Sequence, residues 1–106
     1  MSDYVLLYSG GSMPESEEET ARVMQAWTDW FGQIGAALKD GGNPFSPAAK
    51  TIASNGAVSD GASGTPHSGY TIVKADSLDA ATAIAKNSPV LQGGGSITVY
   101  ETFEAM

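Results

Sequence analysis

The sequence predicts a single α+β domain in which short strands alternate with two helices. Three observations indicate this class: a short apolar run near the N-terminus, an apolar helical face between residues 23 and 38, and glycine-rich or proline-rich turns that divide the rest of the chain. A chain of 106 residues lies within the usual size of one domain. We therefore expect residues 1–106 to form one domain.

The first strand is expected at residues 4–8. These residues read Tyr-Val-Leu-Leu-Tyr, and the run ends at the Ser-Gly-Gly of residues 9–11. A continuous apolar run of this length, rich in aromatic and branched residues, is typical of a strand that is buried on both faces. Because side chains alternate along a strand, both faces of the sheet would receive apolar side chains here.

The first helix is expected to begin near residue 16. Ser16 and Glu19 have the Ser-x-x-Glu spacing of a capping box, in which the serine side chain accepts a hydrogen bond from the third helical residue. One apolar face follows at helical spacing, and the Lys-Asp-Gly-Gly of residues 39–42 ends the pattern. The members of that face are Val23, Trp27, Trp30, Phe31, Ile34 and Leu38.

The middle of the chain is expected to hold an extended connection and a small hairpin. Residues 43–47 contain two prolines, each of which disfavours a helix at the residue before it. Residues 51–53 and 57–59 then flank an Asn-Gly pair at residues 55–56, which is typical of a type I′ hairpin turn. The segment 60–68 has no periodicity and is expected to be a surface loop.

The C-terminal part predicts a strand, a second helix and a last strand. Residues 70–73 read Tyr-Thr-Ile-Val, and either Asp76 or Ser77 can cap the helix that follows. Residues 87–89, Asn-Ser-Pro, stop this helix, and residues 97–100 form the last strand. The apolar face of the second helix is made of Leu78, Ala81, Ile84 and Ala85.

The resulting order is β-α-β-β-α-β with an extra small hairpin, which is the ferredoxin-like pattern of an antiparallel sheet. Two helices can cover only one face of such a sheet, yet the first strand carries apolar side chains for both faces. A symmetric copy of the same chain is the simplest cover for the second face, so we expect a homodimer.

Several segments resemble a known family in their order and spacing. They are Tyr-Val-Leu-Leu-Tyr at 4–8, Asp-Gly at 60–61, Ser-Gly-Tyr-Thr-Ile-Val at 68–73, Asp-Ser-Leu-Asp-Ala-Ala at 76–81 and Gly-Gly-Ser-Ile-Thr-Val-Tyr-Glu at 94–101. With these segments the chain resembles the YCII-related proteins, especially the DGPF-like branch, over nearly its full length. The resemblance implies a dimeric α+β barrel with a cleft between the sheet and the helices.

The resemblance also implies where a catalytic pair would lie. Some YCII-type proteins are thought to use a histidine on the first helix and an aspartate just before a proline at the end of the second. This chain has Met24 and Gln25 around the first place and Ser88 before Pro89 at the second, so neither residue carries over. The DGPF motif also departs from the family pattern, because residues 60–63 read Asp-Gly-Ala-Ser.

Composition argues against several classes of partner and site. The 5 basic and 12 acidic residues give a net charge of -7, which repels nucleic acid and anionic membrane surfaces. The absence of cysteine rules out disulfides, thiolate nucleophiles and thiolate metal sites. The N-terminal segment has no basic region and only a short apolar run, so we expect neither a signal peptide nor a membrane span and place the protein in the cytoplasm.

His67 is the first candidate for chemistry, since histidine is the commonest general acid or base near neutral pH. Asp60 lies in the same expected loop and could orient it. The alternative is an exposed histidine with no role, which is the commoner case in a loop rich in glycine and proline. No second histidine is present to form a metal site, so we expect neither a metal nor a cofactor.

Tyr8, Trp27 and Tyr70 are the candidates for ligand binding, because they could line an apolar cleft that accepts an aromatic or other hydrophobic small molecule. The alternative is that these aromatic side chains only pack the core, which is their commoner role. Two classes of function stay open: a non-catalytic dimeric module that binds a small apolar molecule or another protein, and a small enzyme. The enzyme would be of the lyase or hydrolase type and would act on an apolar or aromatic metabolite with His67 as general base.

Overall fold

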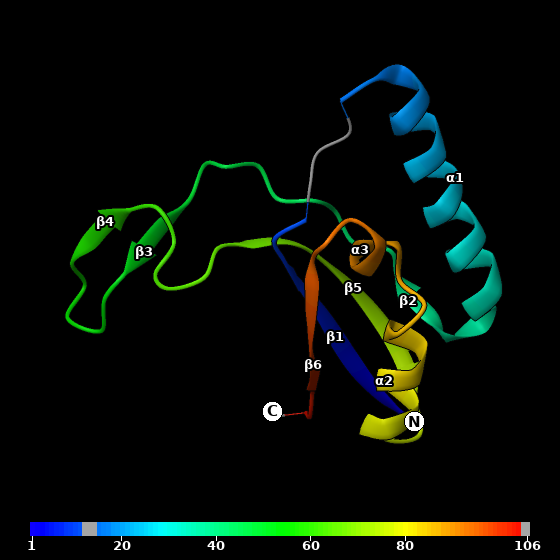
Figure 1. Cartoon of the computed structure of the whole chain (residues 1–106). Coiled ribbons are helices and arrows are strands. Elements are labelled where there is room, and N and C mark those ends of the chain that lie inside the picture. Colours follow the sequence, from blue (N-terminus) through cyan, green and yellow to red (C-terminus); the bar gives the residue numbers. More distant parts are fainter. Residues whose placement is uncertain (12–14, 105–106) are drawn as a thin grey trace.

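The computed structural model describes residues 1–11 and 15–104 (Figure 1). Strands and helices follow one another along these residues as the sequence pattern predicts, with three further short elements, η1, β2 and α3. The elements are β1 (Ser2–Ser9), α1 (Glu17–Ile34), the 3-10 turn η1 (Gly35–Ala37), β2 (Leu38–Asp40), β3 (Lys50–Ile52), β4 (Val58–Asp60), β5 (His67–Ala75), α2 (Leu78–Ala85), α3 (Pro89–Gln92) and β6 (Ser96–Glu101).

The main sheet has four strands in the order β2-β5-β1-β6, and each neighbouring pair is antiparallel. Without the inserted hairpin, these strands are the first to fourth along the chain, and their order across the sheet is that of the ferredoxin-like fold. Strands β3 and β4 pair only with each other and form a separate hairpin. The predicted fold class, including the extra hairpin, is therefore confirmed.

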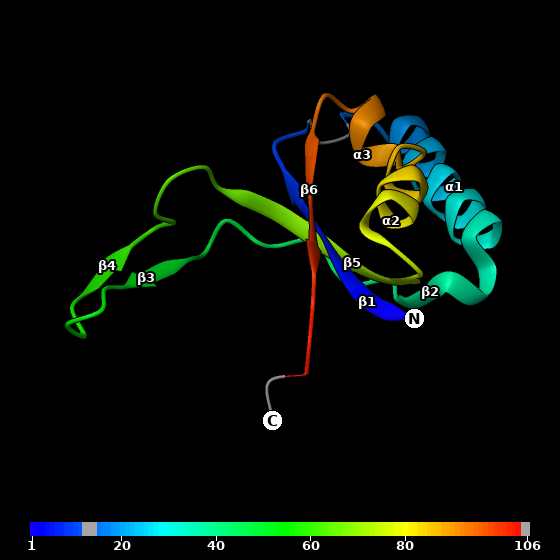
Figure 2. The same ribbon diagram turned by 90° about the horizontal axis from the view of Figure 1, so that it is seen from below.

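The three helices lie on one face of the sheet, and the core fills the space between the two layers (Figure 2). Trp30 of α1 is the largest fully buried side chain, with 2% of its surface exposed. Its indole Nε1 donates a hydrogen bond to the backbone oxygen of Ile84 on α2, at 3.3 Å. The buried apolar residues are Tyr4, Leu6, Tyr8, Trp30, Val73, Ala75, Ala81 and Ala85.

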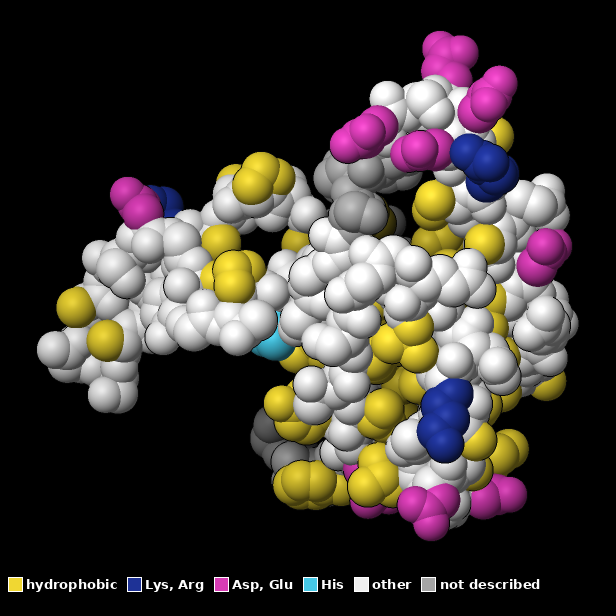
Figure 3. Space-filling view, in the orientation of Figure 1, with side chains coloured by type: hydrophobic (Ala, Val, Ile, Leu, Met, Phe, Trp, Pro, Cys, Tyr) yellow, Lys and Arg dark blue, Asp and Glu magenta, His cyan; other side chains and the backbone are white. Residues whose placement is uncertain are grey.

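Helix α1 starts at the predicted cap and ends earlier than predicted. The Ser16 hydroxyl accepts a hydrogen bond from the Glu19 amide at 3.1 Å, and glutamates fill the first turn, where Figure 3 shows acidic side chains gathered. Gly35 adopts a φ of 51°, and its amide bonds the oxygen of Phe31, which ends the helix. Leu38, which the helical spacing assigned to α1, therefore lies in β2 opposite Val73.

The hairpin turn differs from the predicted type I′ turn. None of the described residues other than glycine has a positive φ, so Asn55 does not adopt the conformation that type I′ requires, whereas Gly56 has a φ of 90°. The Ala53 amide bonds the Ala57 oxygen at 2.7 Å, and the Gly56 amide bonds the Ala53 oxygen at 2.8 Å. This is a loop of residues 54–56, in which a turn is followed by a glycine with positive φ.

The face of the sheet away from the helices has an apolar centre. Val5 pairs with Ile72 and with Tyr100, and Leu7 pairs with Tyr70, so these side chains share one face. They are half-buried or exposed, whereas Tyr4, Leu6 and Tyr8 under the helices are buried. We call the surface made by Val5, Leu7, Tyr70, Ile72 and Tyr100 the open face. The prediction that β1 is buried on both faces is therefore wrong for the single chain.

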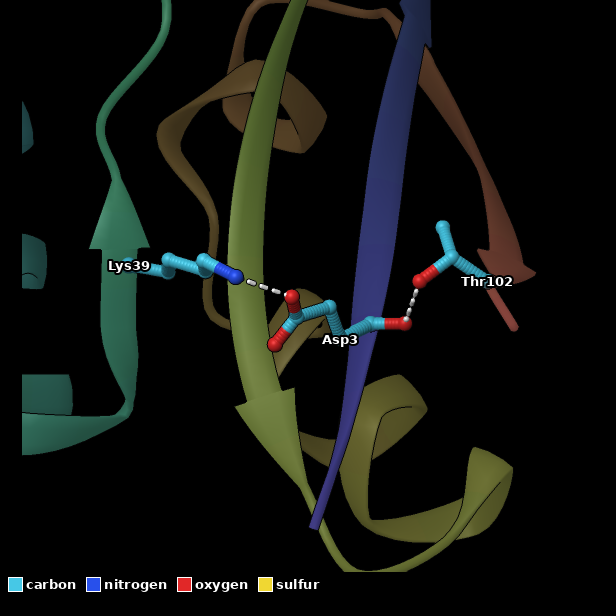
Figure 4. Close-up of polar contacts among 3 residues, drawn as sticks. All are labelled: Asp3, Lys39 and Thr102. Atoms are coloured by element: carbon cyan, nitrogen blue, oxygen red, sulfur yellow. Dashed lines mark hydrogen bonds and ion pairs between the residues drawn. The ribbon is translucent and has the colours of Figure 1, made fainter. Parts of the chain in front are cut away.

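Polar side chains flank this apolar centre along β1. At one end, Lys39 of β2 reaches across β5 to form an ion pair with Asp3 of β1 (Figure 4). The Thr102 hydroxyl donates to the backbone oxygen of Asp3 at 2.9 Å and fixes the same end of the sheet. At the other end of β1, Ser9 pairs with His67 and Ser96.

The inserted hairpin extends away from the sheet and helices in both views (Figures 1 and 2). We call residues 46–66 the arm. The radius of gyration of the Cα atoms is 15.2 Å, whereas a compact domain of this length has about 13 Å. At the root of the arm the Phe45 amide bonds the Ser68 oxygen at 2.8 Å, and the Phe45 ring packs on Tyr70 of the open face.

Candidate functional site

A cluster of hydroxyl groups lies under the helices, where β1, β5 and α3 meet. The Tyr8 hydroxyl donates to Thr71 Oγ1 at 2.5 Å, and Thr71 donates onward to the Gly41 oxygen at 3.1 Å. Ser88 is buried beside them at the N-terminus of α3, where its Oγ accepts from the Val90 amide at 3.4 Å. Three hydroxyls thus converge within a buried region, and hydrogen bonds hold them in position.

Aromatic rings of α1 cover this hydroxyl cluster. The Trp27 ring lies 5.7 Å from the ring of Tyr8, 5.6 Å from that of Trp30 and 5.6 Å from that of Phe31. These α1 side chains meet because residues three and four apart share one face of a helix. Trp27 is half-buried, so part of its ring is accessible from outside the cluster.

Tyr8 is neutral at physiological pH, as an ordinary tyrosine is, and its burial strengthens the preference for the neutral form. Burial raises the pKa of Tyr8 above its ordinary value, and the hydroxyls of Thr71 and Ser88 offset part of that rise. A neutral phenol can donate a hydrogen bond to a ligand or to Thr71, but it does not act as a base at neutral pH. The cluster is therefore suited to hydrogen bonding more than to proton abstraction.

The structure brings together two of the three predicted ligand-binding residues. Tyr8 and Trp27 are in contact, whereas Tyr70 lies on the open face and packs against Phe45, with 5.9 Å between the ring centroids. Sequence reasoning missed Thr71 and Ser88. The signal for Thr71 was its alternation with Tyr70 and Ile72 along one strand, which assigns it to the opposite face.

His67 and Asp60, the predicted acid-base pair, have different hydrogen-bond partners. His67 is the first residue of β5, and its exposed ring nitrogen Nδ1 lies 3.0 Å from Ser9 Oγ, next to an irregularity in the pairing of β1 and β5. Asp60 ends β4 in the arm, and its carboxylate pairs with Lys50 at 2.5 Å. The cooperation of His67 with Asp60 stays a prediction.

Two shallow grooves lie outside the cluster. One, of about 370 Å³, runs between α1 and α2 and is lined by Trp30, Gln33, Ile34, Ala37, Ala83, Ile84 and Asn87. The other, of about 570 Å³, lies at the base of the arm between residues 47–50 and residues 60–61. Both volumes fall in the range of small-molecule sites. Neither groove is lined by Tyr8, Trp27 or His67.

Within residues 1–11 and 15–104, no group of three or more His, Cys, Asp or Glu side chains is arranged to hold a metal ion. In the same ranges no helix has the length and apolar character needed to cross a membrane.

The similarity of this chain to known proteins lies in the fold. The chain matches no protein-family model, and no curated protein is similar to it in sequence. It is similar to the solved structure of 5-chloro-2-hydroxyhydroquinone dehydrochlorinase (TftG) from Burkholderia phenoliruptrix AC1100 in complex with 2,5-dihydroxybenzoquinone. The TM-score is 0.56 at 17% sequence identity, over 96% of this chain and 95% of that one. The chain shares the fold of TftG.

We expect the substitution Tyr8→Phe to lower the free energy of unfolding at pH 7 by about 0.5–1.5 kcal/mol, because it removes the hydrogen bond to Thr71. The folded-state pKa of Tyr8 lies above its unfolded value, so its contribution is complete below about pH 10 and is lost as the pH rises through the folded-state pKa. Urea unfolding at pH 7 and above pH 10 measures this. The expectation would be contradicted if the difference in the free energy of unfolding between the unmodified protein and Tyr8→Phe were as large above pH 10 as at pH 7.

Proposed function

We propose that this protein is a homodimer that binds a small aromatic or other apolar molecule, and that two copies pack through their open faces as a dimeric α+β barrel. The observation that carries the proposal is the open face itself, where an apolar centre lies between polar ends. Stable interfaces between proteins have this arrangement of a hydrophobic core and a polar rim.

A second copy of the chain fits the open face better than solvent does. Val5, Leu7, Tyr70 and Ile72 are half-buried in the single chain, and Tyr100 is exposed. Fully burying such a side chain contributes roughly 1.5–3 kcal/mol, so covering this surface is favourable. A two-fold axis through the face would bring each apolar centre onto the other, as in most homodimers.

The ligand-binding part of the proposal rests on the cluster of Tyr8, Trp27, Thr71 and Ser88. A ring stacked on the accessible part of Trp27 would lie next to Tyr8, and its oxygen substituents would reach the buried hydroxyls only when Trp27 moves aside. The TftG structure supports this class of ligand, since the molecule in its complex, 2,5-dihydroxybenzoquinone, is a planar ring with oxygen substituents. We also infer that the chain is a divergent member of the YCII-related family, given its shared fold and segment order.

Calorimetric titration with 2,5-dihydroxybenzoquinone tests the ligand-binding part. We expect measurable binding by the unmodified protein and about tenfold weaker affinity for Trp27→Leu, since a stacked aromatic pair contributes about 0.5–1.5 kcal/mol beyond the area it buries. Phe103→Leu is the control, because that aromatic side chain is 85% exposed near the C-terminus. Equal affinities for the unmodified protein and Trp27→Leu would place the ligand elsewhere, for instance in the groove between α1 and α2.

A small enzyme is the second candidate. Two observations favour it: the hydrogen bond between Ser9 and His67, which fixes the imidazole, and the fold shared with a dehydrochlorinase. In this hypothesis His67 is the general base, and Asp60 approaches it only after releasing Lys50. If the unmodified protein consumes a titrated compound and the His67→Gln variant does not, the enzyme hypothesis is favoured. Binding without consumption would favour the module, and no binding by any compound would favour a protein partner.

A further inference from the structure

The arm carries an apolar pair on one side of its hairpin. Ile52 on β3 faces Val58 on β4, and the two side chains are 71% and 59% exposed. Thr51 and Ser59 form the next cross-strand pair and point to the other side, where the Thr51 hydroxyl bonds the Gly61 oxygen. Figure 3 shows hydrophobic side chains on the projecting arm. The side that carries Ile52 and Val58 also carries the ion pair of Lys50 with Asp60, one cross-strand pair further along, so it is apolar only at Ile52 and Val58.

In the described part of the chain, no other helix or strand makes an extensive contact with this hairpin. Strands β3 and β4 have three residues each and form a sheet of their own. Both ribbon views show them apart from the helices and from the main sheet (Figures 1 and 2). A two-stranded hairpin alone is at best marginally stable in water, because it cannot bury an apolar face. A surface from another molecule would bury the exposed pair and stabilise this hairpin.

The open face is small, so a second contact would add substantially to the surface that a dimer buries. The four strands have 3, 9, 8 and 6 residues, and at about 3.3 Å per residue and about 4.8 Å between strands they give a flat area of about 400 Å². A standard interface buries about 800 Å² per partner. A further contact beside the open face would therefore increase the surface that such a dimer buries.

The arm begins at the open face and continues its apolar surface. Pro44 bridges to Gly69 of β5, and the ring of Phe45 packs on Tyr70 at 5.9 Å. A molecule that covers Tyr70 would therefore also lie beside Phe45 and the start of the arm. Since a two-fold dimer repeats each contact, the arm of each copy would meet the other copy.

We propose that the arm of each copy packs through Ile52 and Val58 against the edge of the open face of a second copy, so that the two arms clasp the dimer. This inference rests on the proposed homodimer and adds a second contact to it. The arm then has a structural role in assembly, and its marginal hairpin is completed only in the dimer.

Sedimentation equilibrium of the full chain tests the clasp. We expect the double substitution Ile52→Asp with Val58→Asp to raise the dimer dissociation constant at least tenfold, because it places charges in an apolar contact. The matched control is the double substitution Thr51→Asp with Ser59→Asp, which adds the same two charges to the other side of the same hairpin and should change the constant less than threefold. Circular dichroism of each variant checks that the main sheet and helices still fold.

A thiol-reactivity measurement gives a second readout that does not depend on the charged variants. The sequence has no cysteine, so Ile52→Cys introduces a single thiol. We expect this thiol to react at least fivefold more slowly above the dimer dissociation constant than below it, whereas Ser59→Cys reacts at the same rate in both conditions. The clasp would be overturned if the unmodified protein dimerises, the double variant has the same dissociation constant, and the thiol of Ile52→Cys reacts at one rate in both conditions. The open-face dimer would then remain. An unmodified protein that stays monomeric would overturn both.

Discussion

Replacing Trp30 with alanine is expected to lower the free energy of unfolding by about 3–5 kcal/mol, which is the usual cost of removing a large buried aromatic side chain. Trp30 is the largest fully buried side chain, and it connects α1 to α2 through its ring and through the hydrogen bond to Ile84. The smaller α2 residues Ala81 and Ala85 cannot fill the space left behind, so a cavity adds to the lost burial.

Urea unfolding followed by circular dichroism measures this effect, and the slope of the transition shows whether the unfolded state has changed. Phe103→Ala is the control, because it removes an aromatic ring that is exposed to solvent and should cost less than about 0.5 kcal/mol. If Trp30→Ala and Phe103→Ala had similar effects, α1 would not be packed on the sheet and α2 as described.

Replacing Leu7 with aspartate is expected to abolish the dimer, with at least a hundredfold rise in the dissociation constant. Leu7 lies on the central strand β1 between Tyr70 of β5 and Thr98 of β6, so it occupies the middle of the open face. A carboxylate buried there would lose its hydration in both copies without gaining a partner of opposite charge, which costs several kcal/mol.

Sedimentation equilibrium measures the dissociation constant, and circular dichroism checks that Leu7→Asp still folds. The control Met24→Asp makes a comparable change from an apolar side chain to a charge, on an exposed position of α1, and should leave the dimer intact. Dissociation by Met24→Asp and not by Leu7→Asp would indicate that the copies meet through the helices and not through the sheet.

The sequence predicts most of the fold because its strongest signals are local. The Ser16 cap, the Ser77 cap and the apolar spacing of α1 depend on residues within a few positions of each other. Strand β2 escaped prediction because three residues cannot show a period of two, and because it follows directly on an apparently continuous helical pattern. The end of that pattern is set by Gly35, whose positive φ a periodicity does not reveal.

The candidate site was predictable only in part, because it depends on contacts between distant segments. Tyr8 and Trp27 lie on apolar faces that the sequence shows, so their meeting follows from packing α1 on β1. Tyr70 differs from Thr71 by one position along β5, and the register with β1 decides which of the two lies under the helices. In the sequence Ser88 belongs to the Asn-Ser-Pro that ends the second helix, and its burial beside Tyr8 comes from the docking of α3.

The acid-base pair shows why closeness in sequence is a weak guide to chemistry. Asp60 and His67 both border one short loop, yet the first ends a strand of the arm and the second begins a strand of the main sheet. Each strand fixes its own residue next to a different partner, Lys50 for Asp60 and Ser9 for His67. The sheet to which a residue belongs, and not its distance along the chain, decides its neighbours.

The mass of the unmodified protein in solution tests the proposed homodimer most directly. Sedimentation equilibrium over a wide range of concentrations should give twice the chain mass of 10.9 kDa. The Leu7→Asp variant should give the mass of one chain under the same conditions, because it places a charge at the centre of the open face. A single-chain mass for the unmodified protein at every concentration would contradict the proposal that two open faces pack together.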